Sequence, residues 1–154
     1  MRKGKLASKT ILITGGAGFV GSYLAEWYTK EGHLVKVLDD FSSGNPNNIR
    51  PLFNYKNFKL VKGSVLNKDL VYRAVAGVDV IFHLAAQIHV DESIMRSEET
   101  FLVNTVGTLN ILEAALQNDV ELVVYASSSE VYGSAQYVPM DEKHPLNPAS
   151  PYAA

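Results

Sequence analysis

The residues best suited to chemistry are three glycines spaced three apart, Gly15, Gly18 and Gly21. They follow the apolar run 10–14 and precede the amphipathic segment 19–31, so they fall in a strand-to-helix turn. Glycine lets the backbone turn tightly and approach phosphate oxygens, while the free N–H groups of a new helix favour an anion. The spacing therefore predicts a turn that holds the pyrophosphate of a dinucleotide.

Two carboxylates close the next apolar run, 34–38. Asp39 and Asp40 stand about twenty positions past the glycines, where the dinucleotide motif places the group that hydrogen-bonds the adenosine ribose. No Arg or Lys adjoins the pair in the sequence to receive a 2′-phosphate, so the pattern favours NAD over NADP. The alternative interpretation of the pair is a solvated turn.

Two later apolar runs also end in residues of interest. The run 78–84 is followed by the small residues 85–86, which would let a cofactor approach the backbone, or which serve helix packing. Three hydroxyls, 127–129, and the carboxylate of Glu130 follow the run 120–126. Ligands bind at the carboxyl ends of parallel strands, so these side chains are candidates for a site, although serines also cap turns.

The elements that must position these residues alternate along the chain. The apolar runs cover 10–14, 34–38, 58–61, 78–84 and 120–126, and helices are expected over 19–31, 67–76 and 100–117, with a short one near 49–55. Nearly continuous apolar strands predict a parallel sheet buried on both faces, with right-handed crossovers. We expect an α/β fold, a Rossmann-type doubly wound sheet of about five strands in the order 3-2-1-4-5 with helices on both faces.

One polar residue lies within the long helix expected at 100–117. Asn104 interrupts a mostly apolar pattern, and a buried amide must be hydrogen-bonded. We expect it to tie down a neighbouring loop; direct contact with a cofactor is the alternative. A polar stretch, 87–99, precedes this helix.

Composition narrows the classes of function. The chain has 154 residues, of which 47% are hydrophobic, so we expect one domain. A net charge of −2 with both signs interspersed disfavours nucleic acid and membrane partners. There is no cysteine, and the four histidines show no ligand spacing, so no metal site is expected. The basic segment 1–5 precedes no apolar signal core, and a cytoplasmic protein is expected.

With these pieces placed, the chain resembles the nucleotide-sugar epimerase and dehydratase group of extended short-chain dehydrogenases/reductases, most closely the UDP-glucose 4-epimerases. The segments that carry the resemblance are TGGAGFVG at 14–21, LDDFSSG at 38–44, HLAAQ at 83–87, Asn104, SSSEVYG at 127–133 and SPYAA at 150–154. The resemblance implies that residues 1–154 are the NAD-binding part of such an enzyme, incomplete because the substrate-binding lobe lies outside the sequence.

The resemblance implies a set of cofactor-binding residues. They are Gly15, Gly18, Phe19, Val20, Gly21, Asp39, Asp40, Ser42, Ser43, Gly44, Ser64, Val65, Leu84, Ala85, Ala86, Asn104 and Tyr152. Within this set, residues 15–20 hold the pyrophosphate, Asp39 takes the ribose and 40–44 line the adenine side. Ser64 stands where the family often has Asp, which weakens one adenine contact.

The resemblance also implies three catalytic residues, Ser128, Tyr152 and Glu130. Tyr152 would be the base of a Tyr-x-x-x-Lys pair, whose Lys falls two positions beyond Ala154. A nearby cation favours a phenolate, so without that Lys we expect Tyr152 to be a poor base and this chain to be inactive.

The implied reaction is 4-epimerisation of a UDP-sugar through a transient 4-keto sugar. Glu130 is similar to the acidic residue of nucleotide-sugar 4,6-dehydratases and UDP-glucuronate decarboxylases, so these reactions are the alternatives. Ser129 stands where the usual dehydratase has Asp. A non-catalytic NAD-binding module is the alternative of another class. We also expect a homodimer, or self-association through the apolar edge strand at 121–126.

Overall fold

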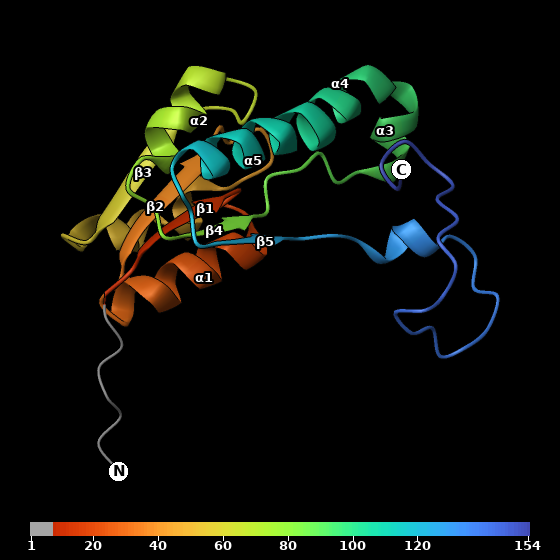
Figure 1. Cartoon of the computed structure of the whole chain (residues 1–154), viewed down its shortest axis with the longest axis horizontal. Coiled ribbons are helices and arrows are strands. Elements are labelled where there is room, and N and C mark those ends of the chain that lie inside the picture. The colour runs from red at the N-terminus through yellow and green to blue at the C-terminus, as the bar shows by residue number, and fades with distance from the viewer. Residues whose placement is uncertain (1–7) are drawn as a thin grey trace, which may run out of the picture.

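Five parallel strands form one sheet in the order β3-β2-β1-β4-β5, as predicted from the sequence (Figure 1). The computed structural model describes residues 8–154, and the basic segment 1–5 lies outside them. The strands are β1 (Thr10–Thr14), β2 (Leu34–Asp39), β3 (Phe58–Lys62), β4 (Val80–His83) and β5 (Leu122–Tyr125). The order reverses between β1 and β4, so the loops after these two strands leave the same edge of the sheet side by side.

The centre of the sheet is buried because its strands carry apolar side chains on both faces. Ile11, Leu12 and Ile13 of β1 are at most 3% exposed, and Val37 and Leu38 of β2 are fully buried. The outer strands are more open, with Leu122 at 53% and Tyr125 at 55% exposure on β5. Alternate residues of each strand therefore feed two separate hydrophobic cores.

Helices cover both faces, as the alternating pattern predicts. Figure 1 shows α1 (Phe19–Lys30) on one face and α2 (Lys68–Val75) with α5 (Gly107–Gln117) on the other. The first core joins Ile11 and Ile13 to α1, and the second joins Leu12 to α2 and α5. Asn67 caps α2 by accepting the Leu70 N–H, and Gly77 follows its end with a φ of +68°.

The helix expected at 100–117 differs from the prediction. The observed segment begins earlier, with α4 (Ser97–Phe101), passes through a π-helical turn (Leu102–Val106) and continues as α5. A further helix, α3 (Val90–Met95), lies within the polar stretch 87–99, for which no helix was predicted. The polar faces of α3 and α4 hid them from a periodicity argument, because both are short and largely exposed.

The remaining connections are short helical turns. The loop after β2 contains 3₁₀ turns at Pro46–Asn48 and Arg50–Asn54, where a short helix was predicted. A 3₁₀ turn at Ser129–Tyr132 follows β5. Near the C-terminus, the N–H groups of Ala153 and Ala154 both donate to the carbonyl of Ser150, a single helical turn that lies beside α3 in Figure 1.

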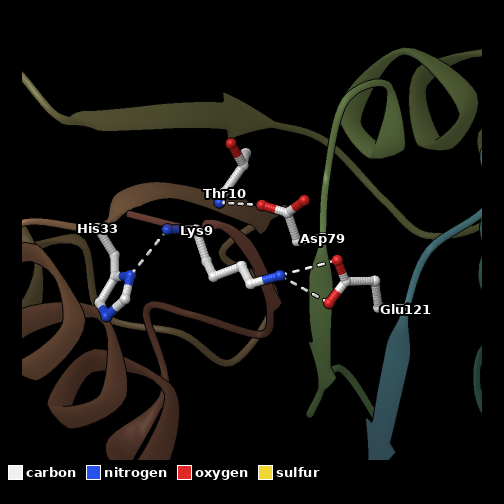
Figure 2. Close-up of polar contacts among 5 residues, drawn as sticks. All are labelled: Lys9, Thr10, His33, Asp79 and Glu121. Carbon is white, nitrogen blue, oxygen red and sulfur yellow. Dashed lines mark hydrogen bonds and ion pairs between the residues drawn. The ribbon is translucent and has the colours of Figure 1, made fainter. Parts of the chain in front are cut away.

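The amino ends of the strands are joined by charged side chains (Figure 2). The Lys9 ammonium lies 2.7 Å from the Glu121 carboxylate, linking β1 to the residue before β5. The Asp79 carboxylate accepts the Thr10 N–H at 2.6 Å, and His33 Nδ1 accepts the Lys9 N–H at 3.0 Å. We call Lys9, His33, Asp79 and Glu121 the amino-edge cluster.

Candidate functional site

The glycine turn lies where β1 ends and α1 begins, and its glycines are required by close packing. Gly15 has a φ of +67°, and a Cβ there would lie 2.8 Å from the Ala85 nitrogen. A Cβ on Gly21 would lie 2.3 Å from the Gly15 carbonyl oxygen. The turn packs so closely against its own helix and against the segment after β4 that no side chain fits at either position.

The start of α1 offers free hydrogen-bond donors. Ser22 is the first helix residue whose N–H is bonded, to the Gly18 carbonyl at 3.0 Å, and within residues 8–154 the N–H groups of Phe19 and Val20 have no acceptor. The side chains of Phe19 and Val20 are 79% and 56% exposed. Free N–H groups at the positive end of a twelve-residue helix form a site for an anion such as a pyrophosphate.

The loop after β2 braces this turn through Ala17. The Ala17 N–H donates to Asp39 Oδ2 at 2.8 Å. Its carbonyl accepts the Asn45 N–H at 3.1 Å and the Asn48 side-chain amide at 2.9 Å. Both backbone groups of this buried residue are satisfied, which fixes the turn. Asn45 and Asn48 could not be singled out from the sequence, where they are two of many turn-forming residues in one loop.

Asp39 has a structural role besides the ribose contact predicted from its position. It is 7% exposed, and its second oxygen accepts the Phe41 N–H at 2.8 Å. Each carboxylate oxygen thus holds one backbone N–H and keeps capacity for a further donor. A Cβ on Gly44 would lie 2.8 and 3.1 Å from the two oxygens, so a side chain at position 44 would press against this carboxylate.

The adenine side of the predicted site is built from the same loop. Asp40 is exposed and accepts the Ser42 N–H at 2.9 Å, and Ser43 is exposed beside it. Phe41 has a positive φ of 63°, which is rare for a bulky residue. Lys62 lies opposite Asp39 in the sheet register, with its Nζ 5.8 Å from the centre of the Phe41 ring. The sequence argument missed this cation because it lies on another strand.

The loop after β3 packs into the core. The Ser64 hydroxyl accepts the Leu66 N–H at 3.3 Å. Val65 is 4% exposed and lies against α5, where a Cβ on Gly107 would come within 2.5 Å of a Val65 methyl carbon. The Asn110 side chain donates to the Val65 carbonyl at 3.0 Å, so this loop is held rigidly at the carboxyl edge.

The segment after β4 is anchored to the glycine turn by a threonine. The Thr14 hydroxyl accepts the Ala85 N–H at 3.1 Å and shares the Leu84 N–H, at 3.2 Å, with its own carbonyl. The neighbouring His83 is 2% exposed, and burial lowers the pKa of its imidazole to about 4. The imidazole is therefore neutral near pH 7. Neither Thr14 nor His83 was singled out as a functional residue from the sequence.

Asn104 ties down a neighbouring loop, as predicted. Its Oδ1 accepts the Gln87 N–H at 2.8 Å, and its Nδ2 donates to the Gln87 carbonyl at 3.0 Å. Asn104 stands at the centre of the π-helical turn, an interruption that often marks functional sites. The segment 84–87, with Ala86 half-buried within it, is thus held at both ends beside the glycine turn.

The three predicted catalytic residues lie in the C-terminal part of the chain. The half-buried Ser128 begins the 3₁₀ turn after β5, and its hydroxyl accepts the Glu130 N–H at 3.2 Å. Glu130 is exposed on the same turn. The Tyr152 N–H donates to the hydroxyl of Ser93 on α3 at 3.2 Å. Their roles stay predictions, since no hydrogen bond within residues 8–154 joins the three side chains to one another.

The described part of the chain has neither a metal-binding cluster nor a membrane-spanning helix. Over residues 8–154, no group of three or more His, Cys, Asp or Glu side chains is placed to hold a metal ion. In the same range, no helix is both long and apolar enough to cross a bilayer.

The chain is similar to known proteins that are named for several different reactions on nucleotide-sugars. The family model described as GDP-mannose 4,6 dehydratase matches residues 12–154. The chain is 44% identical to a UDP-glucose 4-epimerase of Mycolicibacterium smegmatis, 40% to a dTDP-glucose 4,6-dehydratase of Streptomyces niveus and 39% to UDP-glucuronic acid decarboxylase 1 of Xenopus tropicalis. These alignments cover 93%, 94% and 94% of this chain but only 46%, 45% and 34% of the relatives. The chain therefore spans less than half the length of these relatives.

Solved structures show the same fold. A UDP-N-acetylglucosamine 4-epimerase of Methanobrevibacter ruminantium, in complex with UDP-N-acetylmuramic acid, superposes with a TM-score of 0.88 at 31% identity. The match covers 95% of this chain and 46% of that one. A UDP-glucose 4-epimerase of Brucella ovis in complex with NAD gives a TM-score of 0.85 at 27% identity, over 95% of this chain and 44% of that one.

Proposed function

Because this chain belongs to the GDP-mannose 4,6-dehydratase family of nucleotide-sugar-modifying enzymes, we propose that it is the NAD-binding part of a UDP-sugar 4-epimerase. The observation that carries the cofactor assignment is the carboxyl edge of the sheet. There, the N–H groups of α1 that are free within residues 8–154, the carboxylate of Asp39 and the fixed segment 84–87 surround the point where the strand order reverses.

The residues present suit a dinucleotide. A pyrophosphate would lie on the N–H groups of Phe19 and Val20, because these donors have no acceptor within residues 8–154 and lie at a positive helix end. Ribose hydroxyls would donate to Asp39, whose oxygens have spare acceptor capacity. When bound, NAD supplies hydride transfer to and from the sugar carbon. Residues 1–154 would act as one cofactor-binding domain.

The chain's own catalytic groups would move protons. Tyr152 as a phenolate would remove the proton of the sugar 4-hydroxyl, and the Ser128 hydroxyl would hydrogen-bond the same oxygen. The hydrogen bond from the Glu130 N–H orients Ser128, and the bond between the Tyr152 N–H and Ser93 fixes the backbone at Tyr152. Epimerisation would return the hydride to the opposite face of the keto sugar.

Dehydration is the second candidate function. It is favoured by Glu130, a free carboxylate two residues from Ser128 that would do acid/base work on a keto sugar, and by the 40% identity to a dTDP-glucose 4,6-dehydratase. Because we expect residues 1–154 alone to be inactive, the assay uses a longer enzyme that contains them. Incubation of that enzyme with UDP-glucose and NAD separates the two candidates, because epimerisation yields UDP-galactose and dehydration yields a 4-keto-6-deoxy sugar. A product with an unchanged sugar skeleton and inverted C4 supports the first candidate; a keto-deoxy product replaces it with the second.

The cofactor assignment is tested by thermal-shift titration with NAD and NADP. A ligand that binds only the folded state raises the melting temperature. We expect NAD to stabilise more than NADP, and Asp39→Asn to remove most of that difference. Asp79→Asn is the matched control, since Asp79 also accepts a backbone N–H but at the opposite edge.

Three outcomes of this titration bear on the assignment. If neither ligand shifts the wild-type melting temperature, the proposed cofactor site is wrong for this chain. If NADP stabilises as much as NAD and Lys62→Met abolishes only the NADP effect, the cation opposite Asp39 receives a 2′-phosphate and the preference for NAD is wrong. An equal loss in both aspartate variants would remove Asp39 from the site.

Association of this chain through β5 stays a prediction. Its outer edge exposes Leu122, Val124 and Tyr125. A hollow of about 480 Å³ beside it is lined by Leu109 and Leu112 of α5 together with polar residues that include Thr108. Unpaired apolar edges associate. We expect light scattering after size-exclusion chromatography to show dimers, and Val124→Lys to reduce them. A wild-type monomer at high concentration would contradict the prediction.

A further inference from the structure

Buried and half-buried side chains form a continuous hydrogen-bonded path from the glycine turn to the π-helical turn. His83 stands in the middle, with Nδ1 2.6 Å from the Thr14 hydroxyl and Nε2 2.9 Å from the Thr108 hydroxyl. The Thr108 hydroxyl donates in turn to the Asn104 carbonyl at 2.6 Å. The two partners of His83 come from β1 and from α5, 69 and 25 residues away in sequence, so only the fold brings them together.

The direction of each hydrogen bond follows from counting donors and acceptors. The Thr14 oxygen already accepts the N–H groups of Leu84 and Ala85, which occupies both of its lone pairs. Its own hydrogen must therefore donate to His83 Nδ1. A neutral imidazole with an accepting Nδ1 carries its proton on Nε2, which donates to Thr108.

The same count excludes the imidazolium form from this arrangement. A protonated Nδ1 would point its N–H at a Thr14 oxygen that has no acceptor capacity left. Burial already lowers the pKa of His83 to about 4, in the same sense. With neutral His83, every polar atom of the path has a hydrogen-bond partner. Each hydrogen bond then runs in one direction, from Thr14 through His83 and Thr108 to the Asn104 carbonyl.

The path joins the two holders of the segment 84–87. Thr14 holds its first part through the Leu84 and Ala85 N–H groups, and Asn104 holds its end through both backbone groups of Gln87. His83 connects Thr14 to the turn of helix that carries Asn104. The segment lies close to the glycine turn, because a Cβ added to Gly15 would lie within 2.9 Å of backbone atoms of Leu84 and Ala85.

We propose that His83 is a positioning residue for cofactor binding, which as the neutral Nε2–H tautomer locks the segment 84–87 between the glycine turn and the π-helical turn. The inference rests on the proposed NAD site for its consequence, but the lock itself is a property of the unliganded chain. It assigns Thr14 and Thr108 as the two partners through which His83 acts. None of these three side chains needs to touch the cofactor.

The tautomer is tested directly on the wild-type chain by side-chain nitrogen NMR. We expect His83 to show an unprotonated Nδ1 and a protonated Nε2 at pH 7, and to keep both at pH 5.5. A protonated Nδ1, or an imidazolium at pH 7, would overturn the proposal, since Thr14 could not then accept both amides and donate to the ring.

The lock is tested by amide hydrogen exchange in Thr108→Val, with Thr29→Val as the matched control. Both threonines lie on helices, but the buried Thr29 hydroxyl has no hydrogen-bond partner within residues 8–154, whereas Thr108 leaves His83 Nε2–H unpaired when removed. We expect the Ala85 and Gln87 amides to exchange on the order of tenfold faster in Thr108→Val and unchanged in Thr29→Val. His83→Phe, which keeps a ring without hydrogen bonds, should behave like Thr108→Val.

Cofactor titration then separates this inference from the proposed function. We expect Thr108→Val to raise the NAD dissociation constant about tenfold or more, and Thr29→Val to leave it unchanged. If the wild type binds no NAD but the amides respond as expected, the proposed function fails and the lock stands. If exchange and NAD affinity are both unchanged in Thr108→Val and His83→Phe, or if Thr29→Val matches them, His83 is not a positioning residue.

Discussion

The two edges of the sheet use polar side chains in different ways. At the amino ends of the strands, the side chains of Lys9 and Glu121 pair with each other and keep 38% and 59% of their surface exposed. At the carboxyl ends, Asp39, Thr14 and His83 are nearly or fully buried, and they bond backbone groups or one another. The amino-edge cluster links the strand ends to one another, whereas the side chains at the carboxyl edge fix the backbone of the loops that follow the strands.

The difference teaches where a ligand can bind. At the amino edge, the charged side chains bond one another or a backbone N–H, and they do not converge on a common point where a ligand could bind. The carboxyl-edge contacts hold the glycine turn rigid from both sides while the N–H groups of Phe19 and Val20 stay free within residues 8–154. A fixed site with unsatisfied donors costs little reorganisation on binding. The following predictions test this contrast.

The largest effect is expected from a methyl group in the glycine turn. Gly21→Ala places a Cβ 2.3 Å from the Gly15 oxygen, and relieving that overlap must move the turn against α1. We expect a loss of about 3 kcal/mol in the free energy of unfolding and no detectable NAD binding. Urea denaturation and calorimetric titration measure the two.

Gly32→Ala is the control for this change, because a Cβ there meets no atom within 4 Å although φ is +89°. It should cost only about 1 to 2 kcal/mol, from the backbone conformation, and leave NAD binding intact. Equal effects on binding from the two variants would mean that the glycine turn has no special place in the site.

A second effect is expected from acid. The pKa of His83 falls from 6.5 to about 4 on folding, so between these values the unfolded chain binds more protons than the native one. Stability contributed by the neutral imidazole is complete above pH 6.5 and is lost as the pH falls toward 4, amounting to about 2 kcal/mol between pH 7 and pH 5. Urea denaturation at both values should show a smaller loss in His83→Gln; an equal loss would contradict the assignment.

A smaller effect is expected from the aspartate at the amino edge. Asp79→Ala removes the acceptor of the Thr10 N–H, whose bond is 2.6 Å long, and should cost about 1 kcal/mol in the free energy of unfolding. NAD affinity should not change, because β1 still delivers the glycine turn to the opposite edge. A tenfold loss of NAD affinity in this variant would show that the two edges are coupled.

The smallest effect is expected from the ion pair of the amino-edge cluster. Lys9→Met removes an exposed contact with Glu121, and exposed pairs contribute little because water and salt screen them. We expect the melting temperature to stay within the error of measurement, at low and high salt alike. A clear drop that appears only at low salt would give this pair a larger role than its exposure indicates.

Local signals in the sequence predicted most of the framework. Alternating apolar runs gave the five strands and their order, Asn67 marked the start of α2, and Gly32 and Gly77 marked helix ends. The expected role of Asn104 as a loop anchor is confirmed by its two bonds to Gln87. These features depend on neighbours in the chain, or on the general cost of burying an unpaired amide.

Helix α3 and the start of α4 were not predicted, because few signals in their own short segments mark them as helices. Each is held by few residues, and what stabilises α3 is remote: its buried Ser93 hydroxyl accepts the Tyr152 N–H, 59 residues away. The cofactor-binding and catalytic assignments that rest on family resemblance remain predictions, and the titrations above address them.

The sequence by itself determined the fold class, the strand order and the glycine turn, because period, propensity and backbone freedom are properties of short stretches. Only the tertiary structure decided the hydrogen-bonded path through His83, the second role of Asp39 and the position of Lys62 opposite it. These contacts join residues from different strands and helices, so the choice of partner, and with it the tautomer of His83, follows from how the sheet aligns its carboxyl ends.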